Sequence, residues 1–157
     1  MSSHAEEARQ LFLSGANCAQ AVIGAFHREC GIELETALKL GSGFGGGVAR
    51  LREVCGAVSG MVMAAGSLRG YSDLTDKAAK DAHYALIRKL ADEFKAANGS
   101  IICRDLLGLD RQTSDSPVSS ARTEAYYRKR PCVELVVQAA AILERELALT
   151  EPPEQQD

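Results

Sequence analysis

The 157-residue chain contains no tryptophan, and its aromatic residues make up only 5% of the sequence. A core must therefore be built from leucine, alanine, valine and isoleucine. The most apolar stretch, residues 54–68, is too short and too rich in glycine for a membrane span. The N-terminal residues have no basic region followed by an apolar run, so we expect no signal peptide. These absences predict a cytoplasmic protein without membrane insertion.

Excess positive charge is missing as well. The formal net charge is −3 and the sequence pI is about 5.7, whereas nucleic-acid-binding domains carry basic patches. We therefore predict no nucleic-acid partner. A G-x-G-x-x-G spacing begins at Gly41, but a dinucleotide site requires a preceding strand and an acidic residue about 20 positions later. A helical pattern precedes this run, and no acidic residue stands at that distance, so we reject a dinucleotide site.

Strand patterns are also absent, and apolar residues recur at helical spacing along most of the chain. Gly31 and Gly99 supply helix stops, and Pro131 suits the first turn of a helix. The sequence predicts a single-domain, all-α bundle of about six to eight helices within residues 1–150, followed by a disordered tail at 151–157. The expected helices cover residues 6–13, 17–30, 33–40, 50–67, 72–98, 100–107, 121–129 and 131–149.

The clearest helical pattern lies in residues 72–98, where Ser72 or Asp73 is the predicted cap. Its expected buried stripe consists of Leu74, Ala78, Ala82, Leu86, Leu90 and Phe94.

Local cysteine pairs such as Cys-x-x-Cys are missing, although the chain has five cysteines. Four of them, Cys18, Cys55, Cys103 and Cys132, fall at or near the start of separate predicted helices. Unpaired N–H groups give a helix N-terminus partial positive charge, which favours the reactive and metal-binding thiolate. Cys55 lies up to two turns inside its predicted helix, so the argument is weaker there. The fifth, Cys30, stands at a helix end, where the dipole disfavours a thiolate.

Arginines lie close to these cysteines in sequence, and positive charge lowers a thiol pKa. The alternative is that the arginines are solvated surface residues and that each cysteine packs as a small apolar side chain. Only the repeated placement of the cysteines favours a functional interpretation. The arginines concerned are Arg50, Arg52, Arg104, Arg128 and Arg130.

The run that begins at Cys55 and ends at Gly60 fits a Cys-Gly-Ala-x-x-Gly signature. It resembles the signature of the C_GCAxxG_C_C family of redox-active proteins of bacteria and archaea. That family has one cysteine before the signature and two single cysteines after it, and Cys18, Cys103 and Cys132 fit those positions in order. The resemblance covers roughly residues 5–147 and implies redox activity at the four cysteines, with Cys30 outside the pattern.

Two glycine features accompany the signature. Gly45, Gly46 and Gly47 form a loop that is predicted to lie near Cys55, where its N–H groups could bind an anionic cofactor or a sulfur. The alternative is an ordinary linker. A row of small residues, Gly56, Gly60 and Ala64, allows close helix approach, either within the chain or in a homodimer.

Three functions remain open from the sequence. The first is thiol–disulfide chemistry with a redox partner protein or a small thiol or disulfide, and Cys55 is our choice of attacking thiol. The second is an iron–sulfur cluster or a zinc ion held by Cys18, Cys55, Cys103 and Cys132. The third is a helical interaction module with structural cysteines.

Among the histidines, His4 is expected to be solvated.

Overall fold

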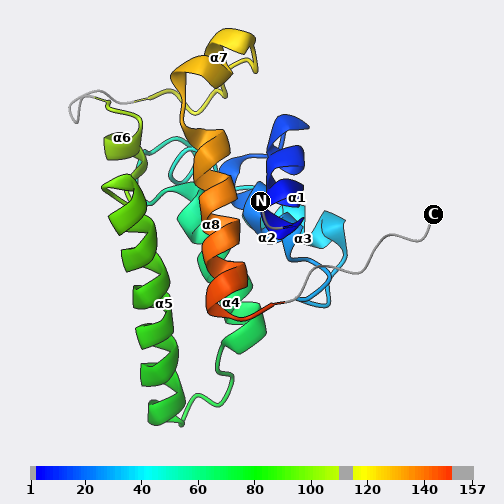
Figure 1. Cartoon of the computed structure of the whole chain (residues 1–157), viewed down its shortest axis with the longest axis vertical. Coiled ribbons are helices and arrows are strands. Elements are labelled where there is room, and N and C mark those ends of the chain that lie inside the picture. The colour runs from blue at the N-terminus through cyan, green and yellow to red at the C-terminus, as the bar shows by residue number, and fades with distance from the viewer. Residues whose placement is uncertain (1–2, 110–114, 150–157) are drawn as a thin grey trace.

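The computed structural model describes residues 3–109 and 115–149 and is all-α, as the sequence predicts (Figure 1). Its described part contains eight helices and no sheet. The helices are α1 (Ser3–Leu13), α2 (Cys18–Ala25), α3 (Leu34–Gly41), α4 (Gly56–Arg69), α5 (Lys77–Asn98), α6 (Cys103–Leu106), α7 (Glu124–Lys129) and α8 (Cys132–Glu146).

The core forms where α1, α2, α4 and α8 meet. Helix α2 packs against α1, α4 and α8, while α3 covers α2 and the long α5 runs beside α8 and α4 (Figure 1). Because the chain has no tryptophan, the largest fully buried side chains are phenylalanines, a methionine, a histidine and aliphatic residues. They include Phe12, Phe26, Phe94, Met61 and Leu143.

The small-residue row packs inside the chain, with α4 lying directly on α2. A Cβ atom added to Gly60 would lie 2.7 Å from the carbonyl oxygen of Ala19, and one added to Gly56 would lie 3.1 Å from the Ala19 nitrogen. Ala64 is fully buried as well. Of the two alternatives left open by the sequence, the row therefore serves helix packing within the chain, and a homodimer stays a prediction that nothing here tests.

Helix α5 differs from its prediction at its N-terminal end. It begins at Lys77, and the Asp76 side chain accepts a hydrogen bond from the Ala79 nitrogen at 2.9 Å. Of the predicted stripe, only Leu90 and Phe94 are buried. The first half of the helix extends beyond the packed part of the bundle (Figure 1), so its apolar spacing has no core to face.

His4 is fully buried, which contradicts the expectation of a solvated side chain. Its Nε2 lies 2.7 Å from a carboxylate oxygen of Glu29, and its Nδ1 lies 2.5 Å from one of Glu144. The ring stacks on Phe26 with centroids 4.4 Å apart. His4 thus ties α1 to α8 and to the turn after α2.

In residues 3–109 and 115–149, no helix is both long enough and apolar enough to cross a bilayer. The predicted tail at 151–157 lies outside the described residues.

Candidate functional site

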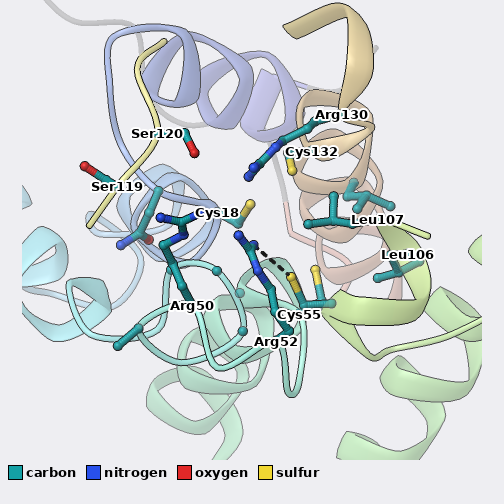
Figure 2. Close-up of a pocket in the computed structure, with 18 of the residues that line it drawn as sticks. Cys18, Arg50, Arg52, Cys55, Leu106, Leu107, Ser119, Ser120, Arg130 and Cys132 are labelled. Carbon is teal, nitrogen blue, oxygen red and sulfur yellow. Dashed lines mark hydrogen bonds between the residues drawn. The ribbon is translucent and has the colours of Figure 1, made fainter. Parts of the chain in front are cut away.

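Four cysteines line one cavity of about 310 Å³ between the N-terminal ends of α2, α4 and α8 and the short α6. Cys18, Cys103 and Cys132 are the first residues of their helices, and Cys55 is the N-cap of α4. Helix α4 begins at residue 56 instead of 50, so Cys55 lies closer to a helix start than predicted. Figure 2 shows Cys18, Cys55 and Cys132 around the same space.

Cys18 and Cys132 both line the cavity, each as the first residue of its helix, and each thiol changes the acidity of the other. The influence of the Cys18 thiol, assisted by nearby arginines and opposed by burial, lowers the pKa of Cys132 from 9.0 to about 7. The Cys132 thiol, together with burial and the other neighbouring thiols, raises the pKa of Cys18 well above its ordinary value. Cys132 is therefore the more acidic thiol of this pair, and Cys18 is the less acidic one.

Local sequence explains how these two residues are held. Asn17 accepts a hydrogen bond from the Gln20 nitrogen at 2.9 Å, and the Gln20 side chain accepts one from the Asn17 nitrogen. This capping box fixes the start of α2. Pro131 is the N-cap residue of α8, immediately before Cys132.

Cys55 and Cys103 are brought together by an isolated antiparallel bridge between Val54 and Ile102. The Cys55 nitrogen donates to the Ile101 oxygen, and the Cys103 nitrogen donates to the Glu53 oxygen, each at 2.7 Å. Each cysteine follows a bridge residue, so both side chains leave the same face.

Burial controls the acidity of this second pair. It raises the pKa of Cys55 to about 12, although the nearby backbone N–H groups of Ala57 and Val58 act in the opposite direction. Burial also raises the pKa of Cys103, against the effect of a hydrogen bond from Arg52. Both residues therefore remain protonated thiols at neutral pH.

The glycine-rich loop is a tight left-handed turn rather than an extended linker. Five consecutive residues, 46–50, have positive φ angles, and their backbone bonds include Arg50 N to Gly45 O and Arg52 N to Gly46 O. Left-handed backbone costs roughly 1–2 kcal/mol for each non-glycine residue. A Cβ atom on Gly47 would lie 2.7 Å from Cβ of Cys103, so this glycine permits the approach of the loop to α6.

This turn places Arg50 and Arg52 at the cavity (Figure 2). The Arg52 side chain is only 2% exposed; its Nε donates to Asp115 at 2.5 Å and its Nη1 to the Cys103 sulfur at 3.6 Å. Its Nη2 is buried and has no hydrogen-bond partner within the described part of the chain. Arg50 lies 3.9 Å from the same carboxylate.

Two more arginines reach the cavity from the segment before α8. Arg122 donates to the carbonyl oxygens of Phe12 and Ala16 at 3.2 and 2.9 Å, and it stacks over the Phe12 and Tyr126 rings. The Arg130 guanidinium lies 4.7 Å from the Tyr126 ring centre. Both lower the pKa of Cys132 through their charge.

The sequence named Arg50, Arg52 and Arg130, and all three line the cavity. Arg104 and Arg128, also named, are not among its lining residues. Arg122 was missed, because it lies ten positions before the nearest site cysteine and no local signal links it to them. The predicted Gly45, Gly46 and Gly47 do line the cavity.

In the ranges 3–109 and 115–149, no group of three or more histidine, cysteine, aspartate or glutamate side chains is placed to hold one metal ion. Cys18, Cys55, Cys103 and Cys132, as positioned, therefore do not form a four-ligand shell. The cluster and zinc alternatives stay predictions from sequence.

Comparison with known proteins adds one match. No curated protein and no solved structure is detectably similar to the chain. The model of one protein family, described as "Putative redox-active protein (C_GCAxxG_C_C)", matches residues 16–146, which include all four cavity cysteines. The chain therefore belongs to the C_GCAxxG_C_C family.

Proposed function

We propose that the protein is a thiol–disulfide oxidoreductase in which Cys132 attacks and Cys18 resolves. The observation that carries this proposal is that Cys18 and Cys132 line one cavity as the first residues of their helices, where the Cys18 thiol and nearby arginines lower the pKa of Cys132 to about 7. A thiol with a pKa near the ambient pH combines a large thiolate fraction with good nucleophilicity. The sequence-based choice of Cys55 is less favourable, since its pKa of about 12 leaves almost no thiolate at neutral pH.

The reaction begins when the Cys132 thiolate attacks one sulfur of a substrate disulfide. The substrate S–S bond breaks, one half leaves as a thiolate that takes up a proton, and a mixed disulfide forms on Cys132. Cys18 then loses its proton and attacks the Cys132 sulfur. The second substrate half leaves as a thiol, and a Cys18–Cys132 disulfide remains, so two electrons and two protons have passed to the substrate.

A dithiol reductant then returns the pair to its reduced state. The predicted cytoplasmic location agrees with this step, because that compartment keeps protein thiols reduced. Cys55 and Cys103 have raised pKa values and remain thiols while the first pair reacts.

A single-turnover experiment tests the proposal. Anaerobically reduced protein is mixed with one equivalent of bis(2-hydroxyethyl) disulfide, and released thiol and protein mass are measured. Two thiols should be released by the native protein. Cys18→Ser should release one thiol and retain the other substrate half on Cys132, and Cys132→Ser should release none in this phase.

The matched control is Cys30→Ser, because Cys30 does not line the cavity. This variant should behave as the native protein does. Undiminished thiol release by Cys132→Ser would overturn the proposal.

A further inference from the structure

We infer that the cavity selects small disulfides that carry carboxylate groups next to the reacting sulfurs. This inference rests on the proposed function and specifies its substrate class. Among the described residues that line the cavity, four are arginines and none is a carboxylate. The arginines are Arg50, Arg52, Arg122 and Arg130.

Arg52 supplies the strongest argument. Its guanidinium lies at the cavity (Figure 2) and it is 2% exposed; two of its nitrogens have partners, while Nη2 has none among residues 3–109 and 115–149. An unpaired buried N–H donor on a cation is costly, so it favours an anionic acceptor. A substrate carboxylate that approached the Cys132 side of the cavity would supply that acceptor.

The four arginines differ in how many of their interactions are already made with other groups of the protein. Asp115 pairs with Arg52 and lies 3.9 Å from Arg50, so one carboxylate offsets part of two positive charges. Arg122 is committed to two backbone carbonyls. Arg130 contacts the face of Tyr126. Arg50 and Arg130 are therefore the residues with charge left for a ligand at the cavity rim.

The dimensions and the neutral polar lining agree with this substrate class. A cavity of about 310 Å³ lies at the small end of ligand sites and excludes most of a folded protein. Asn17, Ser42, Ser119 and Ser120 add uncharged hydrogen-bonding groups to the lining. Because Cys55, Cys103 and Cys132 are at most 8% exposed, a small molecule that enters the cavity reaches them more readily than a protein disulfide does.

The first test does not require disulfide turnover. Iodoacetate and iodoacetamide both alkylate a thiolate with loss of iodide, and they differ in charge. We measure both rates at Cys132 by peptide mass spectrometry and divide their ratio by that of a free model thiol. Since the cavity attracts anions, the corrected ratio should favour iodoacetate by roughly tenfold. It should fall in Arg50→Gln and Arg130→Gln, whereas Arg88→Gln, in α5 and outside the cavity lining, should leave it unchanged.

A corrected ratio of one in the native protein, or equal ratios in the native protein and both cavity variants, would overturn the inference even if the protein reduces disulfides. Iodoacetamide alone, followed from pH 5 to 10, shows whether each variant keeps a reactive Cys132 and hence a folded site.

The second test uses three disulfides of similar size: 3,3′-dithiodipropionate, bis(2-hydroxyethyl) disulfide and cystamine, which are anionic, neutral and cationic. Single-turnover rates, corrected by the rate of each disulfide with a free model thiol, should decrease in that order, with at least tenfold between the first and the last. Equal corrected rates would overturn the inference and leave the proposed function intact. No reaction with any of the three would contradict the proposed function, and the alkylation ratio would then decide whether the cavity attracts anions.

Discussion

Removal of the Cys18 thiol should change the pH dependence of Cys132 alkylation in a way that a merely structural cysteine would not. In the native protein the Cys18 side chain is the largest cause of the lowered Cys132 pKa. Cys18→Ala removes that thiol, so the Cys132 pKa should rise from about 7 toward the ordinary value of 9.0. Cys18→Ser keeps a hydroxyl donor and is the matched control.

The magnitude follows from two opposing effects. With a pKa of about 7, half of Cys132 is thiolate at pH 7, and with a pKa of 9.0 the thiolate is roughly 1%, a fall of about 50-fold. Nucleophilicity rises with pKa and recovers about eightfold over the same interval. The net decrease at pH 7 is therefore about sixfold at most, because Arg122 and Arg130 remain in the variant. Above about pH 8 the order reverses, and Cys18→Ala should react faster than the native protein.

The assay is iodoacetamide alkylation from pH 5 to 10 with quantification of the peptide that contains Cys132. The expected signature is a crossover of the native and Cys18→Ala rate profiles, while Cys18→Ser follows the native profile. Superimposable native and Cys18→Ala profiles would refute the claim that Cys18 lowers the Cys132 pKa.

Two further predictions concern the scaffold of the site. Gly47→Ala introduces a side chain at a φ of +69° and 2.7 Å from Cβ of Cys103, so the free energy of unfolding in urea should fall by about 2–4 kcal/mol. Gly43→Ala, with open space around its added Cβ, should cost less than about 1 kcal/mol, and equal costs for the two variants would contradict this account of the turn. His4→Ala leaves two partly buried carboxylates without their shared partner and should lower the free energy of unfolding by about 3 kcal/mol. A loss below about 1 kcal/mol would show that the His4 contacts contribute little.

The sequence predicts well which segments are helical and where many helices begin and end, because capping residues and helix-ending glycines are local features. Asn17 and Gly99 are examples, the first capping α2 and the second ending α5 with a left-handed φ of 92°. The first half of α5 shows the limit of such patterns. Apolar periodicity cannot reveal where the neighbouring helices end, so Leu74 and Ala82 were expected to be buried and are exposed.

The site shows the same division between local and non-local information. Placement of four cysteines near helix starts was predictable from capping residues and proline. Their meeting at one cavity was not, because it depends on the Val54–Ile102 bridge and on a left-handed turn in which non-glycine residues adopt positive φ angles. The sequence also could not predict which cavity cysteine has the lowest pKa. The Cys132 pKa depends on Cys18, which lies more than 100 residues earlier in the sequence.

The most direct test of the central claim is the identity of the first disulfide that the protein forms. Reduced protein is oxidised with one equivalent of a small disulfide, free thiols are blocked at low pH, and peptides are mapped without reduction. The account predicts a Cys18–Cys132 link, with Cys30, Cys55 and Cys103 recovered as free thiols. A first link between Cys55 and Cys103, or any first link that includes Cys30, would contradict it.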